Sequence, residues 1–320
     1  MMNMKQATTQ FLQWRKDNGY ARNTLDAQKA VLKHLGEEVG WEAAPSTINT
    51  RHVLAVMDKD RAAARTANLR KTHISTFVTW CKDEGVCQPT WNPMRGIRKR
   101  KVMETERKRV NINDLERLVS GAETERERIL LALSINLLLR ISEVSDLRIK
   151  DINMQAGEVS VRIFKTSELD TMPMTAELQE ELRRYLLWYT LQCGPLDPDW
   201  YLIPSDTGGY KPLIQPDRPK GRLATIIQGS LRRIGWEDVK GEGGHTLRRS
   251  GARWMLMALE DQGVERALRI VQHMLHHKSI EQTEHYLGIS VDVQHRNIAL
   301  KGRRWYTPQE GDGYGQVVNL

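Results

Sequence analysis

At 320 residues, the chain is long enough for two domains, each with its own hydrophobic core. Its hydrophobic content of 40% and charged content of 28% are those of a folded protein, and they exclude an intrinsically disordered chain. Lys and Arg outnumber Asp and Glu by 48 to 40, and the net charge of +8 favours a polyanionic partner, nucleic acid first. An excess of this size also occurs in proteins that bind no nucleic acid.

The cysteines and the N-terminus bear on the cellular setting. Cys81, Cys87 and Cys193 cannot all pair with one another and show no C-x-x-C spacing, so we expect neither a disulfide framework nor a zinc ribbon. The N-terminus has no basic segment followed by an apolar run, which predicts no signal peptide. No stretch approaches the roughly 18 apolar residues of a membrane span. These features predict a soluble cytoplasmic protein with no membrane partner.

Residues 5–88 are predicted to form a small all-α unit. Helical spacing of apolar residues predicts one helix that starts with Phe11, Leu12 and Trp14, a second from Leu25 to Gly36 capped by Asn23-Thr24, and two more. The last two cover Thr50 to Lys59 and Arg61 to Lys82. The final helix leaves Arg61, Arg65, Arg70 and Lys71 outside its packing stripe. Such a charged face is usually only solvated, and DNA contact is the alternative.

The composition changes between Gln88 and Val110, where Pro89, Pro93 and Gly96 break regular structure. A dense basic run then follows: Arg95, Arg98, Lys99, Arg100, Lys101, Arg107, Lys108 and Arg109. The run is either a solvated linker or a basic strap across a phosphate backbone, and the two are compatible. We therefore expect a helical domain at 1–90 and a basic linker at 91–109.

From Asn113 the pattern is again helical, and the strongly apolar stretch Glu125 to Leu139 predicts a core helix. Arg140 follows it directly, with Glu143 three residues later. The alternating segments Leu147 to Ile152 and Glu158 to Phe164 predict a small antiparallel sheet.

Lys165 stands where the second strand gives way to the turn Thr166 to Asp170, and Met172 to Met174 is a candidate third strand. A lysine beside a turn is more often solubilising than catalytic.

Helices are expected at Ala176 to Gln192 and Arg222 to Ile234, with an extended piece at Trp200 to Ile203 and a loop at Pro204 to Pro219. The stretch Gly243 to Gly288 that follows carries the most chemistry.

His245 and Arg248 are three residues apart and would share one helix face, so both can converge on a small anion. His276, His277 and then Tyr286 follow. Cation, imidazole and phenol around one pocket favour phosphate chemistry with a tyrosine nucleophile.

These positions resemble the tyrosine recombinases, or phage-type integrases, over about residues 108–290. That family carries an Arg in a G-x-R-x-S-E box, a Lys on a β-hairpin, an H-x-x-R box and an L-G-H box nine residues before a nucleophilic Tyr. The matching stretches here are Leu138 to Glu143, Lys165, His245 to Arg248, Leu275 to His277, and Tyr286. Leu138 and His276 stand where the family usually has glycine.

The resemblance implies a fold that is mainly α with a small antiparallel β-sheet: an all-α core-binding domain and an α+β catalytic domain at 110–290. It implies that Tyr286 attacks the scissile phosphate while Arg140 and Arg248 hold its oxygens. Lys165 would be the general acid and His245 the base. His277, rather than His276, would face the phosphate, and Glu143 would orient the neighbouring Arg.

No cofactor is implied, because the bond energy stays in the covalent link. The absence of a G-x-x-x-x-G-K-[ST] loop, which binds nucleotide phosphates, agrees with that.

The implied partners are a double-stranded DNA recombination site and three further copies of the chain in a Holliday-junction tetramer, with an accessory directionality factor possible. The tail at 291–320 is a candidate for packing on a neighbouring copy. The implied setting is a prokaryotic or phage-encoded protein acting on the nucleoid.

Residues for which DNA contact is expected are Arg61, Arg65, Arg70, Lys71, Arg95, Arg98, Lys99, Arg100 and Lys101. Two other functions stay open: a non-enzymatic DNA-binding regulator, and a DNA-relaxing enzyme of the type IB topoisomerase kind.

A zinc cluster is an alternative role for four histidines of the C-terminal stretch: His273, His276, His277 and His285. Without a paired Cys, an H-E-x-x-H motif or a nearby carboxylate set, that reading is disfavoured.

Overall fold

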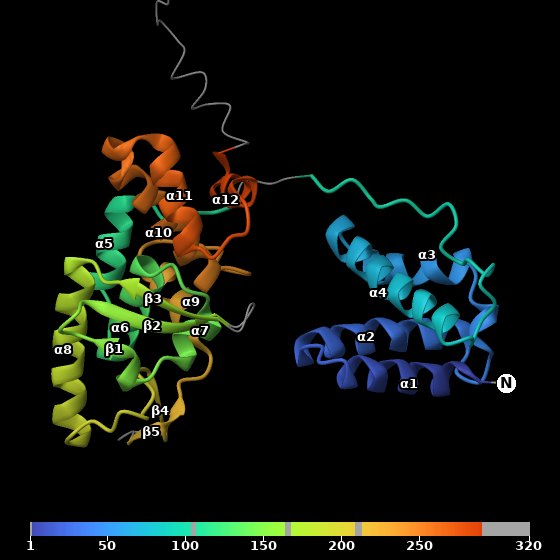
Figure 1. Ribbon diagram of the computed structural model, residues 1–320, viewed down its shortest axis with the longest axis horizontal. Coiled ribbons are helices and arrows are strands. Elements are labelled where there is room, and N and C mark those ends of the chain that lie inside the picture. Colours follow the sequence, from blue (N-terminus) through green and yellow to red (C-terminus); the bar gives the residue numbers. More distant parts are fainter. Residues whose placement is uncertain (1, 104–106, 164–167, 209–212, 290–320) are drawn as a thin grey trace, which may run out of the picture. The chain divides into compact units, whose positions relative to one another are not determined.

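The computed structural model describes residues 2–103, 107–163, 168–208 and 213–289 (Figure 1). The chain divides into two compact units, Met1–Thr105 and Glu106–Leu320. Each unit has its own hydrophobic core, so each is described by itself. No helix in the described parts is long and apolar enough to cross a membrane.

The first unit is all-α. Its helices are α1 (Met4–Asp17), α2 (Arg22–Val39), α3 (Thr50–Asp58) and α4 (Ala64–Asp83), with 3-10 turns at Pro45–Thr47 and Lys59–Arg61. The Phe11 ring lies at the centre of the core and makes edge contacts with Phe77 and Trp80, at centroid distances of 5.4 and 5.5 Å. The apolar periodicity of the sequence is therefore the packing face of this unit.

Three predicted helix starts in this unit are wrong. The first helix begins at Met4, with Asn3 as its N-cap, and not at Phe11. The second helix begins at Arg22 with Ala21 as its N-cap and no side-chain cap, so Asn23-Thr24 lies inside the helix. The fourth helix begins at Ala64 and not at Arg61. The backbone has positive φ at Asp60 (58°) and Arg61 (51°), and this left-handed conformation interrupts the α-helical path.

Part of the segment expected as a linker packs on the first unit. Trp91, Met94 and Ile97 lie against its core, and the Trp91 indole donates to the carbonyl of Ile48 at 3.3 Å. The Asn68 side chain makes two hydrogen bonds with the backbone of Arg100, at 2.9 and 2.8 Å. Residues 91–100 are thus held by specific contacts.

The second unit contains eight helices and two small antiparallel sheets among its described residues. The helices are α5 (Ile112–Ser120), α6 (Glu125–Asn136), α7 (Ile141–Asp146), α8 (Ala176–Cys193), α9 (Leu223–Arg233), α10 (Gly244–Ala258), α11 (Val264–Met274) and α12 (Ile280–Leu287). The main sheet has the order β1 (Ile152–Asn153), β2 (Glu158–Ile163), β3 (Glu168–Pro173). The chain is therefore mainly α with small antiparallel sheets, as the sequence predicts.

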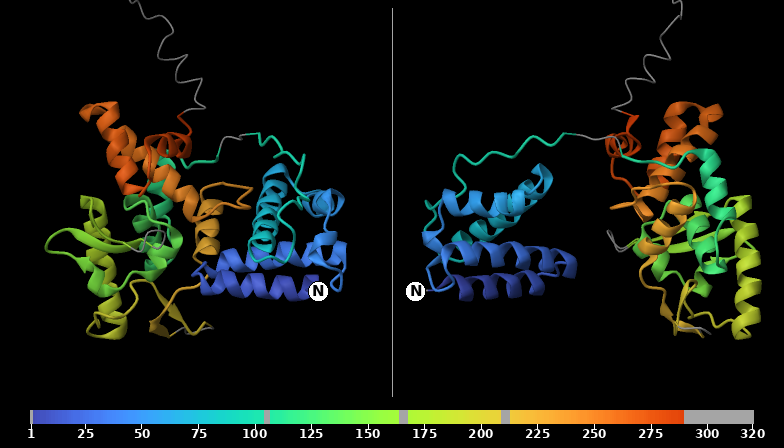
Figure 2. Two further views of the ribbon diagram at one scale, coloured as in Figure 1. Left: turned by 45° about the vertical axis from the view of Figure 1, so that its right-hand side comes forward. Right: turned by 180° about the vertical axis from the view of Figure 1, so that it is seen from behind.

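Helix α6 is the centre of this unit, because its residues are buried on almost every side. Helix α10 packs directly on it, and a Cβ at Gly251 would lie 2.2 Å from the carbonyl oxygen of Ile135. Only glycine allows the two helices to approach so closely. This contact brings the start of α10 near the end of α6, where Arg140 follows. Figure 2 shows α11 and α12 at one end of the unit, and the β4–β5 sheet at the other.

The loop expected at Pro204 to Pro219 is wrong in part, because β4 (Pro204–Asp206) pairs with β5 (Ile214–Pro219). Proline lacks a backbone donor, yet it is tolerated on edge strands, and both strands of a two-stranded sheet are edges. The strand expected at Leu147 to Ile152 is wrong too. Its backbone bonds to residues 198–202, for example Leu202 N–H to Leu147 O at 2.7 Å, and only Ile152 and Asn153 pair with β2.

The hairpin formed by β2 and β3 is longer than expected. Strand β3 begins at Glu168, inside the predicted turn, and pairs with β2 from Glu158↔Pro173 to Ile163↔Glu168. Val161 and Ile163 of β2 are buried in the core, whereas Leu169 of β3 is 81% exposed. The end of β3 nearest the turn is therefore not held by apolar burial.

Candidate active site

Arg140 immediately precedes α7 and is fixed there by Glu143. Its backbone N–H donates to Glu143 Oε2 at 2.7 Å, and its guanidinium Nη1 donates to Glu143 Oε1 at 2.8 Å. Glu143 is only 1% exposed, whereas the Arg140 side chain is half-buried. The arginine that follows the apolar helix is thus held at a buried carboxylate with part of its surface open.

Arg248, one turn into α10, is almost fully buried. Its Nη2 donates to the carbonyl of Leu275 at 2.5 Å, and its Nη1 lies 3.7 Å from Glu143 Oε2. Glu143 therefore stands between two guanidinium groups that are more than a hundred residues apart. Burial lowers the pKa of Arg248 to about 10, and the charge of Arg140 adds to this, while Tyr286 and Glu143 oppose it. The group is still a cation at neutral pH.

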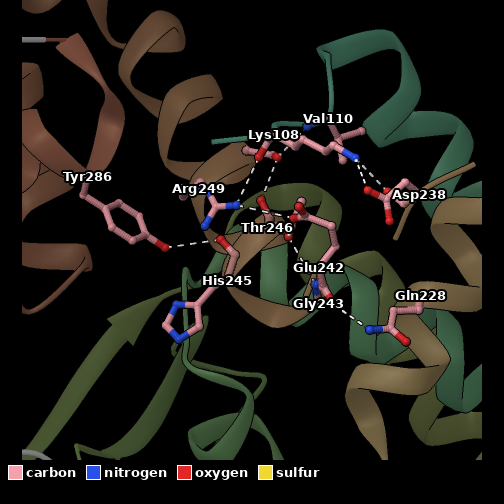
Figure 3. A network of polar contacts seen from close by, with 11 residues as sticks. Lys108, Val110, Gln228, Asp238, Glu242, Gly243, His245, Thr246, Arg249 and Tyr286 are labelled. Atoms are coloured by element: carbon pink, nitrogen blue, oxygen red, sulfur yellow. Dashed lines mark hydrogen bonds and ion pairs between the residues drawn. The ribbon is translucent and has the colours of Figure 1, made fainter. Parts of the chain in front are cut away.

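Tyr286 lies near the end of α12. Its hydroxyl donates to the backbone carbonyl of His245 at 3.4 Å (Figure 3). Its ring packs edge-on against the ring of His277, with centroids 5.2 Å apart and planes at 78°. Burial raises the pKa of Tyr286, and the charges of Arg248 and Arg249 work against that rise. The phenol is therefore protonated at neutral pH, and a nucleophilic role requires a base.

His245 lies in the first turn of α10, with an exposed side chain. Desolvation by the surrounding protein lowers the pKa of His245, and the charges of Arg248, Arg249 and Arg140 lower it further. A neutral imidazole at pH 7 is able to accept a proton. The hydroxyl of Tyr286 is bonded to the backbone of His245 and not to its ring.

The doubled histidine points in two directions. His277 Nδ1 lies 3.1 Å from Thr283 Oγ1, and its ring faces Tyr286. His276 Nε2 lies 2.8 Å from Asp170 Oδ2 on β3. That His277 faces the phosphate stays a prediction, since its contact with Tyr286 concerns the free protein. No group of three His, Cys, Asp or Glu able to hold a metal ion occurs within the described ranges.

The two residues that stand where the family usually has glycine, Leu138 and His276, both have a positive backbone φ. Leu138 has φ 52° and His276 has φ 51°, a left-handed region that side chains with a Cβ adopt at a cost. The backbone thus keeps the conformation that favours glycine although the side chain has changed. Leu138 is completely buried, and His276 is partly buried.

Arg249 is a residue of this site that the sequence argument missed. Its Nη2 donates to the carbonyl of Lys108 at 3.1 Å and lies 3.6 Å from Glu242 Oε2 (Figure 3). Its charge acts on both Tyr286 and His245. The available signal was its position directly after Arg248. Successive residues of a helix are rotated by about 100°, however, which would normally turn Arg249 to another face.

The end of the basic run is bound to the catalytic helices. Arg109 Nη1 donates to the carbonyl of Leu287 at 2.7 Å, at the C-terminus of α12. Val110 N–H donates to Ser250 Oγ at 2.8 Å, and Lys108 Nζ donates to the carbonyl of Asp238 at 2.8 Å (Figure 3). A cation at a helix C-terminus is favourable, so Arg109 stabilises the helix that carries Tyr286.

The other expected site residues fall into four groups. Lys165 and the tail at 291–320 lie outside the described residues. Arg70 donates to the carbonyls of Val56 and Lys59, and Arg100 pairs with Asp58, so both guanidinium groups bind within the first unit. Lys71 is half-buried. The exposed members are Arg61, Arg65, Arg95, Arg98, Lys99 and Lys101.

Comparisons with known proteins agree with this geometry. The model of the phage integrase family matches residues 108–292. The chain is 24% identical over 272 residues to the tyrosine recombinase XerA of Pyrococcus horikoshii, with 85% of each chain covered. It is 25% identical over 257 residues to the tyrosine recombinase XerC of Proteus mirabilis, covering 78% of this chain and 76% of the relative.

Solved structures show the same fold. A lambda integrase (75–356) dimer bound to a COC′ core site superposes with a TM-score of 0.68 at 19% identity, covering 97% of this chain and 100% of that one. A lambda integrase tetramer bound to a Holliday junction gives a TM-score of 0.67 at 19% identity, covering 89% and 77%. Since the family model spans more than half of its length, the chain belongs to the phage integrase family, the tyrosine recombinases, which are enzymes of DNA strand transfer.

Proposed function

We propose that the protein is a site-specific recombinase that cuts and rejoins DNA through Tyr286. The phenolic oxygen attacks the scissile phosphorus, a Tyr286–phosphorus bond forms, and the bond to the 5′ oxygen breaks. The DNA is left with a 3′-phosphotyrosyl link and a 5′-hydroxyl. The observation that carries this proposal is a tyrosine hydroxyl held at the backbone of His245, close to arginines whose charges act on its pKa.

The remaining groups of the site divide the work around that step. Arg140 and Arg248 hold the non-bridging oxygens, because guanidinium offers paired donors to phosphate. Glu143 holds both arginines in place. His245 takes the proton of Tyr286, Lys165 gives a proton to the leaving 5′ oxygen, and His277 donates to the phosphate. Fixed donors around a developing charge supply most of the acceleration in such a reaction.

The exchange of strands between two duplexes would involve more than one copy of the chain. We propose a duplex recombination site as substrate and a homotetramer as the active form, by analogy with the lambda integrase tetramer bound to a Holliday junction. Residues 1–90 would bind the core site, 91–109 would be the basic linker, and 110–290 would carry the chemistry. The tail at 291–320 would pack on a neighbour. The enzyme would act in the cytoplasm, with or without an accessory directionality factor.

Covalent capture tests the nucleophile. The DNA site is first selected from random-sequence duplexes with the purified protein, and a copy with a nick beside the scissile phosphate then traps the intermediate. Wild-type protein should form an adduct resistant to denaturation, and Tyr286→Phe should form none. Tyr20→Phe is the matched control, since Tyr20 is 41% exposed in the first unit. An adduct that persists in Tyr286→Phe would contradict the assignment.

The same experiment separates the other two functions. Tight binding without any adduct would favour a non-enzymatic regulator on this fold. Adduct formation with relaxation of supercoils, but no recombinant product from two sites, would favour a topoisomerase-like enzyme.

A further inference from the structure

A side-chain contact joins the β2–β3 hairpin to the segment between α11 and α12. His276 Nε2 lies 2.8 Å from Asp170 Oδ2, although the two residues are 106 positions apart in the sequence. The His276 side chain is 16% exposed and that of Asp170 is 46% exposed. The contact is therefore partly shielded on the histidine side.

His276 makes this contact from a backbone position that favours glycine. Its φ is 51°, and a residue with a Cβ adopts that conformation only when the surroundings impose it. A glycine here would relieve the strain, but it would have no side chain to reach Asp170. The presence of histidine at a strained position thus coincides with a specific contact.

Each partner of this contact adjoins a part of the proposed active site. His276 directly precedes His277, whose ring faces Tyr286. Asp170 pairs with Val161 in a ladder that runs to Ile163↔Glu168. Lys165 follows Ile163 by two residues in the sequence and lies outside the described residues. Because β2 and β3 are paired in a fixed register, a contact that fixes the position of Asp170 also restricts the position of Ile163 at the end of β2.

We propose that His276 and Asp170 form a latch that positions the β2–β3 hairpin for the protonation of the leaving oxygen. The inference rests on the proposed function and on Lys165 as the general acid. The end of β3 needs such a hold, since Leu169 beside Asp170 is 81% exposed and contributes little packing. His276 is a positioning residue in this scheme, and it touches neither the phosphate nor the leaving group.

A structural ion pair would behave differently from a latch. A surface pair typically contributes little to stability, so its loss should not change one step of the reaction selectively. A latch acts on one step only, the departure of the 5′ oxygen. The two are distinguished by a substrate in which that departure needs no acid.

Such a substrate carries sulfur in place of the bridging 5′ oxygen at the scissile phosphate. A thiol has a pKa of about 8.5 whereas water has one of about 15.7, so a thiolate leaves without being protonated. The probe is the nicked, selected DNA duplex in two forms, with oxygen or with sulfur at this position. The measurement is the single-turnover rate of adduct formation with the full-length protein.

Four variants test the latch: His276→Gly, His276→Gln, Asp170→Ala and Lys165→Ala. On the oxygen substrate, His276→Gly and Asp170→Ala should be slower than wild type by about 10- to 100-fold, the effect of a misplaced catalytic group. His276→Gln should stay near the wild-type rate, since its amide donor reaches the place of Nε2. On the sulfur substrate, all four should approach the wild-type rate.

The melting temperature is measured on the same samples. His276→Gly should melt no lower than wild type, because the loss of strain offsets the loss of the contact. A slow variant with normal stability then reports positioning and not unfolding.

Two results would overturn the latch while leaving the recombinase intact. One is a wild-type rate of His276→Gly on the oxygen substrate. The other is a defect of His276→Gly that persists on the sulfur substrate while Lys165→Ala is rescued. A Lys165→Ala defect that sulfur does not rescue would remove the general-acid assignment and the latch together. No adduct from the wild-type protein would remove the proposed function itself.

Discussion

Leu138 and His276 share one backbone conformation but differ in what their side chains do. Both have φ near 50°, at positions where the family usually has glycine. Leu138 is completely buried in the cluster formed by α10, α11 and α12, with Ala252, Leu275 and Leu287 as neighbours. Its side chain therefore contributes to the core that carries the nucleophile helix, whereas that of His276 makes a polar contact at the edge.

Replacement of Leu138 by glycine should destabilise the protein although it relieves the backbone. The left-handed conformation costs about 1–2 kcal/mol for a residue with a Cβ. Emptying a buried leucine site costs about 2–5 kcal/mol, which is the larger effect. Chemical denaturation should show a lower free energy of unfolding for Leu138→Gly. A midpoint at or above that of the wild type would show that the packing is less important than the strain.

The lowered pKa of His245 predicts how the rate of DNA cleavage depends on pH. Because the pKa of His245 is lowered, its neutral form persists below the usual value of about 6.5. The rate of adduct formation should therefore fall only when the pH drops below about 6.5, as the base becomes protonated. Single-turnover rates between pH 5 and 8 measure this acidic limb.

His245→Gln should remove the acidic limb as well as slow the reaction, because glutamine does not titrate. An unchanged limb in this variant would assign the titration to another group and would contradict the role of His245 as base.

At the scale of elements, the close approach of α10 to α6 decides where the catalytic groups lie. Helix α6 ends shortly before Arg140, and α10 begins with His245 and Arg248. Their contact at Gly251 leaves no room for a Cβ, which would lie 2.2 Å from the carbonyl oxygen of Ile135. The distance between Arg140 and Arg248 thus depends on Gly251, which has no catalytic side chain.

Gly251→Ala should push α10 away from α6. The expected cost is about 1–3 kcal/mol, the range for overpacking in a core. Gly229→Ala is the matched control, since Gly229 lies in α9 and a Cβ there would only come within 3.8 Å of the Arg233 side chain. That variant should be stabilised by up to about 1 kcal/mol, because alanine is the better helix former. Equal stabilities of the two variants would contradict the packing argument.

At the scale of the whole molecule, the basic residues of the first unit are not equivalent. Arg98 is exposed, whereas Arg100 two residues later forms an ion pair with Asp58 and bonds through its backbone to Asn68. Net charge alone does not separate them. The guanidinium group of Arg98 is therefore available to a phosphate backbone, whereas that of Arg100 is already paired with Asp58.

The salt dependence of DNA binding should separate these two kinds of residue. Each phosphate contact that is lost should reduce the slope of log K against log salt by about 0.9. Arg98→Gln should therefore lower the slope, and Arg100→Gln should leave it unchanged. Titrations of a labelled duplex at several salt concentrations measure both. An equal change in the two variants would mean that Arg100 leaves Asp58 when DNA binds.

Local properties of the sequence determined the helices, the hairpin and the order of the functional residues. Apolar periodicity depends only on neighbouring residues, which is why the all-α first unit and the core helix α6 were predictable. The motifs around Arg140, His245 and Tyr286 were also readable, since the residues of each motif lie within a short stretch of the sequence. The β4–β5 pairing was missed, because prolines suggest a loop whenever the strand partner is unknown.

The tertiary structure alone decided which distant groups meet. Glu143 contacts Arg140 three residues away, but its position beside Arg248 depends on how α7 and α10 pack. The contact between His276 and Asp170 has the same origin. Side chains far apart in the sequence meet only after the core has formed, and the arrangement of that core depends on packing between helices, which no local pattern encodes.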